Sequence, residues 1–185
     1  PSPGVVRPDQ YVGVTTYTAT GATGYTVFGL NFTPDMVWIK STDAAYNHNL
    51  FDVTRPNTST GNGYAILRPD TVGAQDVSGN FIDIVPGLHG FTALSNGSPF
   101  NEDGTNYVAW CWKAGGNKNT FNVDDVGYAS AAAAGLSGGT ITPTGASIGT
   151  KQGFSIIKWT DANGVQSLPH GLSQAPDFIL IKDLG

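Results

Sequence analysis

The stretch NYVAWCWKAGG, residues 106–116, places two tryptophans around the only cysteine of the chain and ends in a glycine pair. Side chains alternate between the two faces of a strand, so both faces of this one are apolar: Tyr107, Ala109 and Cys111 on one, Val108, Trp110 and Trp112 on the other. Two apolar faces are typical of a central strand with cover on each side. A sugar-binding platform would instead expose one aromatic face beside polar groups. We therefore predict a structural core that contains Trp38, Tyr107, Trp110, Cys111 and Trp112, with Trp112 as the first candidate for an exception because it lies nearest the strand end.

The composition of the 185-residue chain is that of a turn-rich, folded β protein. It contains 25 glycines and 11 prolines, and 11% of its residues are aromatic, which supplies apolar area for a core. The net charge is -5, and the nine Lys and Arg residues are scattered, so we expect no nucleic-acid binding. No apolar run is long enough to cross a membrane, so no membrane insertion is expected. The single cysteine excludes a disulfide within the chain.

Short apolar stretches bounded by Gly, Pro, Asn or Asp recur along the chain, and each has the length of a strand. They lie at residues 11–18, 36–40, 64–67, 81–85, 90–94, 106–112, 153–159 and 177–182. No segment carries a convincing amphipathic helical stripe, and the Ala-rich residues 129–136 fit either a brief helical turn or an extended linker. The pattern predicts an all-β protein, built as an antiparallel β-sandwich or jelly-roll-like module.

An internal repeat relates residues 12–40 to residues 154–182 without a gap, at an offset of 142 residues. The shared pattern is G-L-x-x-x-P-D-x-x-x-I-K. Glycine permits a positive φ, proline fixes φ, and the aspartate can accept a bond from a backbone N–H, so the pattern predicts strand, turn, strand. The repeat turn motif consists of Gly29, Pro34 and Asp35 in the first copy and Gly171, Pro176 and Asp177 in the second.

The repeat suggests a division of the chain into four parts. We expect an extended N-terminal arm (1–10), a β-sandwich module (11–118), a Gly/Ala/Thr-rich connector (119–150) and the first strands of a second, related and truncated β module (151–185). Two interpretations of the last part remain open. Either this chain is the N-terminal part of a longer protein, or its last strands complete the sheets of the first unit.

Three segments resemble a known but uncharacterised β-rich domain of structural proteins from marine tailed phages, of the cyanophage type. They are FTPDMVWIKSTDAAYNHNLFDVTR (32–55), GFTALSNGSPFNEDGTNYVAWCWKAGG (90–116) and residues 139–182, which are similar to the repeat that commonly follows that domain. One departure is Pro56, which stands where the family pattern has glycine. The resemblance implies a tail or appendage protein of the virion, often found beside lectin-like modules. It carries over no catalytic residue.

Candidates for chemistry are few. The acidic loop 101–106 and the pair Asp124-Asp125 lack the spacing of a calcium loop, and the three histidines lack zinc-ligand spacing, so we expect no metal and no cofactor. Catalytic motifs are not recognisable either, so we expect no catalytic residues and no enzyme. The polar loops 55–64 and 93–106 are suited either to ligand contact or to simple connection, with Asn57, Asn62, Asn96, Asn101 and Asp103 as the candidate contact residues.

The preferred hypothesis is a virion structural component of a tailed phage: a tail fibre, spike or capsid decoration that is assembled in the host cytoplasm. Its expected partners are other virion proteins, copies of itself, for which we expect a trimer, and a host-surface glycan. The alternative is a secreted or surface carbohydrate-binding, lectin-like module. A polysaccharide depolymerase is the third hypothesis, for which Asp52, Asp76, Asp83, Glu102 and Asp103 are the available carboxylates.

Overall fold

The computed structural model describes residues 7–96 and 99–185. In these ranges it contains eleven β-strands, one short 3-10 helix, η1 (Pro8–Gln10), and no α-helix. The prediction of an all-β protein is therefore confirmed. Of the expected N-terminal arm, residues 1–6 lie outside the described residues, and η1 forms its end. No helix in the described part of the chain is long and apolar enough to cross a membrane.

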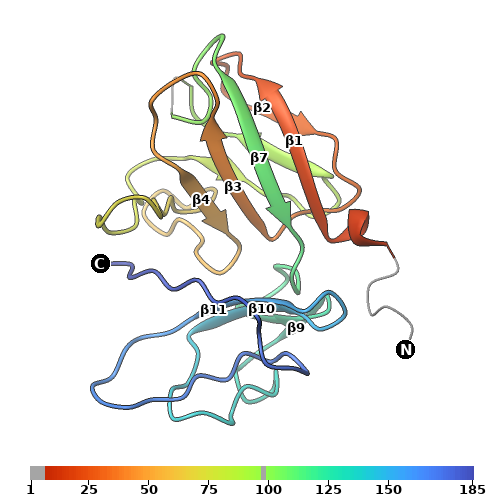
Figure 1. The fold of residues 1–185 in the computed structure, drawn as a ribbon, viewed down its shortest axis with the longest axis vertical. Helices are drawn as coiled ribbons and strands as arrows, with labels where there is room; N and C mark the ends of the chain where they lie inside the picture. Colours follow the sequence, from red (N-terminus) through yellow and green to blue (C-terminus); the bar gives the residue numbers. More distant parts are fainter. Residues whose placement is uncertain (1–6, 97–98) are drawn as a thin grey trace.

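Two layers form the first part of the molecule (Figure 1). The front layer is an antiparallel sheet in the order β1 (Val12–Thr18), β7 (Asn106–Trp112), β3 (Met36–Ser41) and β4 (Asn49–Asp52). Behind it lies a smaller antiparallel sheet in the order β2 (Tyr25–Phe28), β6 (Gly90–Ala93) and β5 (Ile82–Asp83). The two layers make a sandwich.

The main core fills the space between these layers. Alternate residues of β3 and β7 point into it, and Val37, Ile39, Ala109 and Cys111 are all fully buried. Their neighbours from other elements include both aliphatic and aromatic side chains. The ring of Tyr17 stacks on that of Tyr107 with centroids 5.2 Å apart. The core therefore depends on one face of β7, which carries its smaller side chains and Tyr107.

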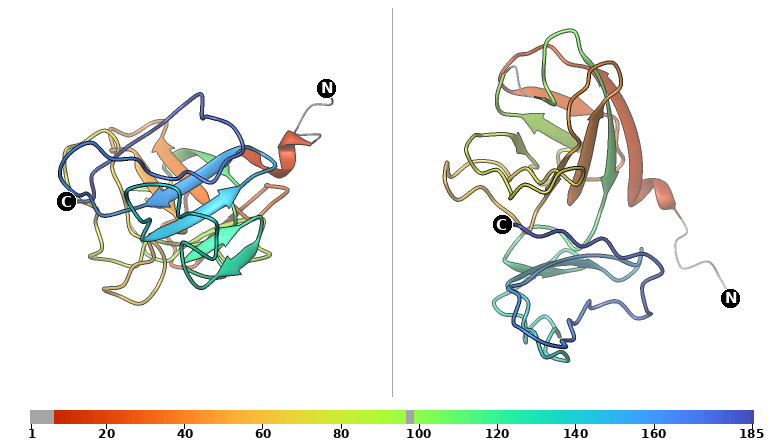
Figure 2. Two further views of the ribbon diagram at one scale, coloured as in Figure 1. Left: turned by 90° about the horizontal axis from the view of Figure 1, so that it is seen from below. Right: turned by 60° about the vertical axis from the view of Figure 1, so that its left-hand side comes forward.

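A separate sheet packs below the sandwich, as the turned views in Figure 2 show. Because it belongs to the second part of the molecule, we call it the second sheet. Its order is β11 (Phe154–Lys158), β10 (Gly145–Gly149), β8 (Phe121–Val123) and β9 (Val126–Tyr128), and β8 runs parallel to β10. It covers a small core of its own, centred on Phe121, Leu136 and Ile148. The structure thus differs from the expected connector, because residues 119–150 contain three strands and contribute most of this core. Residues 131–135, within the Ala-rich segment, form turns.

The two copies of the repeat share a first strand and a glycine with positive φ, but residues 167–170 form no counterpart of β2 and residues 178–182 no counterpart of β3. β1 begins at Val12 and β11 at Phe154, so the strand starts differ by the repeat offset. Gly29 and Gly171 both have positive φ, at 111° and 72°. Beyond this point Met36–Ser41 form β3, whereas residues 178–182 are extended chain outside any strand.

Candidate functional site

The three tryptophans predicted to lie in the core lie instead on the outer face of the front sheet. Tyr107 and Cys111 are buried as predicted, but Trp38, Trp110 and Trp112 are partly exposed. The prediction was wrong for the three indole rings because the sandwich covers only one face of β7. Alternation along the strand assigned the two faces correctly, but it could not show that one of them lacks a covering layer.

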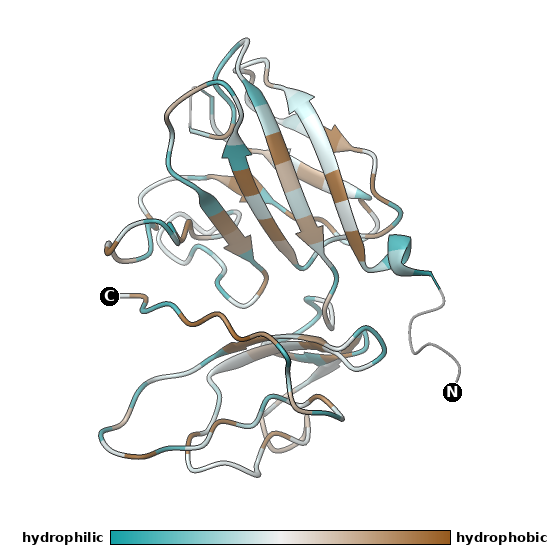
Figure 3. Ribbon diagram, in the orientation of Figure 1, coloured by the Kyte–Doolittle hydropathy of each residue, from teal (hydrophilic) through white to brown (hydrophobic). Residues whose placement is uncertain are grey.

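The three indole rings and the outward side chains beside them form one surface across β1, β7 and β3, which we call the tryptophan face. It consists of Val12, Val14, Met36, Trp38, Trp110 and Trp112. The strand register places Trp110 directly between Val14 and Trp38, and Trp112 directly between Val12 and Met36. Directly opposed residues of neighbouring strands share a face and touch. Figure 3 colours the ribbon by hydropathy, and hydrophobic segments alternate with paler ones along the strands of the front sheet.

The polar groups of the tryptophan face are unequally engaged. The indole N–H of Trp38 donates to Nδ1 of His48 at 2.9 Å, and the two rings meet edge to face. Within the described residues, the indole N–H groups of Trp110 and Trp112 have no protein acceptor. The ring of Trp112 stacks on Phe154 of β11, with centroids 6.2 Å apart. Trp110 therefore offers a ring surface and a free donor together.

The polar loops do not form a shared contact site. They lie at opposite ends of the front sheet, because β4 ends opposite Met36 whereas β7 begins beyond Ser41. Of the five candidate residues, Asn57 and Asn101 are buried, at 2% and 0% exposure, which contradicts a role in ligand contact. Both are structural. Asn57 accepts the N–H groups of residues 59 and 60, and Asn101 donates to the carbonyls of residues 22 and 95.

The other three candidate residues, Asn62, Asn96 and Asp103, are exposed. Exposure keeps them available for contact, but no feature of the structure brings them together. They remain predicted contact residues only.

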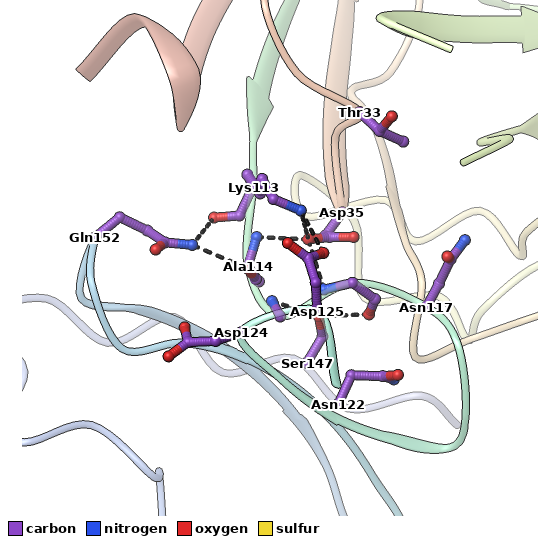
Figure 4. A network of polar contacts seen from close by, with 12 residues as sticks. Thr33, Asp35, Lys113, Ala114, Asn117, Asn122, Asp124, Asp125, Ser147 and Gln152 are labelled. Carbon is purple, nitrogen blue, oxygen red and sulfur yellow. Dashed lines mark hydrogen bonds and ion pairs between the residues drawn. The ribbon is translucent and has the colours of Figure 1, made fainter. Parts of the chain in front are cut away.

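A network of polar contacts joins the sandwich to the second sheet directly after β7 (Figure 4). Its centre is Asp35 of the repeat turn motif, which is 2% exposed. The Asp35 carboxylate accepts the N–H groups of Ala114 at 2.7 Å and of Gly116 at 3.0 Å. The N–H of Asp35 also donates to the carbonyl of Trp112 at 2.7 Å. The motif thus fastens the start of β3 to the end of β7.

Gly115 explains the glycine pair of the opening stretch. Its N–H donates to the hydroxyl of Ser147 at 2.9 Å. A Cβ atom at this position would collide with the backbone of Ile148 and Asn122, so only glycine allows the chain to pass this closely over the second sheet. The run Lys-Ala-Gly-Gly is therefore the connection between the two parts of the molecule.

The β8–β9 hairpin completes this junction. Its turn residues Asp124 and Asp125 have φ of 48° and 67°, a conformation that a two-residue type I′ hairpin turn requires and that glycine usually supplies. The Asp125 carboxylate accepts a hydrogen bond from Nζ of Lys113 at 2.7 Å, and the Asp124 carboxylate accepts one from the N–H of Thr150 at 2.9 Å. Both carboxylates serve to hold the hairpin against its neighbours.

Charge at the junction is partly compensated. Burial raises the pKa of Asp35 above its usual value, while Lys113, whose Nζ is 4.0 Å away, and the two N–H donors oppose the increase. A cleft of about 390 Å³ opens beside these groups and is lined by both lysines and aspartates. Among the described residues, no cluster of three or more His, Cys, Asp or Glu side chains could hold a metal ion.

Several carboxylates considered for catalysis are engaged in structural contacts. Asp52 and Arg55 form a buried ion pair at 2.6 Å. Asp76 accepts the N–H of Ser78 at 2.9 Å, and Glu102 accepts the hydroxyl of Tyr46. Asp83 is partly exposed and Asp103 exposed. Asp52, Asp76 and Glu102 therefore have structural roles.

The family assignment covers nearly the whole chain. The family described as "Domain of unknown function (DUF7483)" matches residues 7–185. The chain belongs to this family. The matched region includes both the sandwich and the second sheet, so the junction at Asp35 lies inside one family domain. No curated protein and no solved structure matches the chain.

Proposed function

We propose that this chain is a structural component of a tailed-phage virion, a tail fibre, spike or capsid decoration, which acts by binding and assembly. It is assembled in the host cytoplasm and contacts other virion proteins and copies of itself, as a trimer. The resemblance of residues 32–55 and 90–116 to phage structural proteins supports the class of protein. The observation that carries a binding role is the tryptophan face.

The tryptophan face has the properties of a protein contact surface. Aromatic residues are enriched at the centres of interfaces, where large rings bury much apolar area. Here three indoles lie in adjacent strands of one sheet, beside Val12 and Val14, which are 48% and 58% exposed. A sheet also holds these rings at fixed spacings, so little ordering is required when a partner binds.

Purified particles test this proposal. An antibody against this chain, applied to phage particles and viewed by electron microscopy, is expected to label one defined position on the virion. The double variant Trp110→Ser, Trp112→Ser is expected to incorporate poorly. Phe28→Ser is the matched control, because Phe28 is a 63% exposed aromatic residue on the other layer of the sandwich. Unlabelled particles, or equal incorporation of both variants, would contradict the proposal.

Carbohydrate binding is the second candidate function, and the free indole N–H of Trp110 favours it. A pyranose ring stacks on an indole, and its hydroxyl groups need donors and acceptors close by; Thr16 and Lys40 lie in adjacent outward positions of the same face. The ligand would be a host-surface glycan. A glycan array with the wild-type chain and with Trp110→Ala distinguishes the two candidates. Glycan binding by a chain that never enters particles would replace the virion proposal with the lectin-like one.

A further inference from the structure

An asparagine that is followed by glycine can react with its own backbone. The chain contains three such pairs, at residues 62–63, 96–97 and 163–164. The structure describes the first and the third pair in full, whereas Gly97 lies outside the described residues. Asn62 and Asn163 are both exposed to solvent, so exposure alone does not distinguish them.

The reaction is an attack of the glycine backbone nitrogen on Cγ of the asparagine side chain. The nitrogen gives up its proton to solvent as the new N–C bond forms, and the side-chain amide leaves as ammonia. The resulting succinimide ring then takes up one water molecule and opens at either of its two carbonyls, which yields aspartate or isoaspartate. Glycine favours the attack because it has no Cβ atom beside the nitrogen and few restrictions on φ. The backbone must also be free to bring the nitrogen against the side chain.

The turn that contains Asn62 lacks this freedom. The backbone N–H of Asn57 donates to the carbonyl of Gly63 at 2.9 Å. The carbonyl of Asn62 accepts the hydroxyl of Thr60 at 3.2 Å. A Cβ atom at Gly63 would collide with the carbonyl of Ile82, so the backbone there packs closely against β5. Asn62 can reach the nitrogen of its neighbour only after some of these contacts break.

The segment around Asn163 has no such restraint. Residues 159–166 follow β11 and make no hydrogen bond within the described part of the chain. Gly164 has a φ of 101°, and a Cβ atom there would meet no other atom within 4 Å. Val165 is fully exposed. The chain is fastened again at Ser167, whose N–H donates to the hydroxyl of Thr140 at 2.9 Å.

The free segment is specific to the second copy of the repeat. At the repeat offset, residues 163–164 correspond to Gly21 and Ala22. In the first copy this turn is fastened by Asn101, whose side-chain amide donates to the carbonyl of Ala22 at 2.9 Å. The first copy therefore combines a held turn with a sequence that cannot react, and the second combines a reactive pair with a free backbone.

We infer that Asn163 is a site of spontaneous modification, which converts to aspartate and isoaspartate in the folded chain while Asn62 is protected. The change adds one negative charge to the loop, and the isoaspartate form also adds one carbon atom to its backbone. Water is the only other reactant. The inference is independent of the proposed role in the virion, because it depends only on the local backbone.

Peptide mapping by mass spectrometry tests this inference on the whole 185-residue chain. Native and urea-unfolded samples are incubated side by side at neutral pH, in water labelled with heavy oxygen, which marks only the product formed during the incubation. In the native sample, conversion is expected to be at least about tenfold faster at Asn163 than at Asn62, because release of one hydrogen bond costs on the order of the barrier change that alters a rate by this factor. In the unfolded sample the two rates are expected to be similar, because both pairs are then equally free.

Two variants separate the chemistry from the restraint. Gly164→Ala is expected to slow the conversion of Asn163, because the added Cβ atom shields the attacking nitrogen. Asn57→Ala removes the side chain that accepts the N–H groups of residues 59 and 60, and it is expected to raise the native rate at Asn62 without changing the rate at Asn163. Asn47→Ala is the matched control, because Asn47 is exposed, and it leaves both rates unchanged.

The wild-type comparison decides the inference even if Asn57→Ala fails to fold, which thermal unfolding would show. Native conversion at Asn62 that is as fast as at Asn163 overturns the inference. So does an Asn163 that converts in the unfolded sample but not in the native one. An unchanged rate at Asn62 in a folded Asn57→Ala chain would overturn the assignment of its protection to this turn.

Discussion

Removal of the Asp35 carboxylate tests the role of the junction most directly. In Asp35→Ala, the buried N–H groups of Ala114 and Gly116 lose their acceptor. Each unsatisfied buried donor costs about 1–3 kcal/mol, so the two together cost about 2–6 kcal/mol, and the removal of a desolvated carboxylate offsets part of this loss. We therefore expect the free energy of unfolding to fall by about 2–4 kcal/mol. Asp35→Asn keeps an acceptor oxygen in place and is expected to lose less.

Urea unfolding, followed by intrinsic fluorescence, measures both variants. The pH dependence supplies a second test. A carboxyl group whose pKa is raised by folding binds more protons in the folded chain than in the unfolded chain, between the two pKa values. The contribution of Asp35 is therefore fully present below the unfolded value of about 4 and is lost as the pH rises through the folded value. Asp35→Asn has no such titration.

The stability of the wild type relative to Asp35→Asn should thus decrease as the pH is raised from about 4. A relative stability that increases over this range would show that Lys113 and the two N–H donors outweigh burial. A cost below about 0.5 kcal/mol for Asp35→Ala, which is the range of ordinary surface substitutions, would show that the junction does not depend on this carboxylate.

Three further predictions concern the two faces of the front sheet and its edge. Trp110→Ala is expected to lower the free energy of unfolding by only about 1–2 kcal/mol, because the ring is partly exposed, whereas Phe51→Ala in the core costs about 3–5 kcal/mol. Equal losses for the two variants in urea unfolding would show that Trp110 is a core residue. Burial raises the pKa of Cys111 to about 12, so its thiol should stay unreactive toward a disulfide reagent at pH 8 until guanidinium unfolds the chain; rapid labelling of the native chain would contradict this. Arg55→Ala leaves the buried Asp52 without its ion-pair partner and should lower the free energy of unfolding by about 3–5 kcal/mol. The double variant Arg55→Met, Asp52→Asn should lose less, because no lone charge remains, and thermal and urea unfolding of both variants decide whether the charge or the packing matters.

The strands with dense apolar sequence were predictable, since β3 and β7 occupy the residues that alternation indicated. Periodicity also separated the two faces of β7. What it could not provide was the number of covering layers, which depends on elements far away in the sequence. Alternation alone therefore places the tryptophans in the core, whereas a β-sandwich buries only one face of each of its sheets.

The second sheet was the least predictable part. β8 and β9 have three residues each, and their turn uses two aspartates where glycine or asparagine is usual. β10 pairs with β8 in parallel, across a long connection that leaves no local signal. Asn57 and Asn101 were mistaken for contact residues because asparagine is common both in recognition loops and in buried turns, and sequence does not distinguish the two.

The position of β7 between β1 and β3 has a consequence for synthesis of the chain. Both neighbours leave the ribosome long before residues 106–112 do, and they pair with β7 rather than with each other. The front sheet therefore cannot form during translation until β7 emerges. Until then β1 and β3 remain without the strand with which both of them pair. Early truncations of the gene product should accordingly be prone to aggregate, while those that extend just past Gly116 should be the first to become soluble.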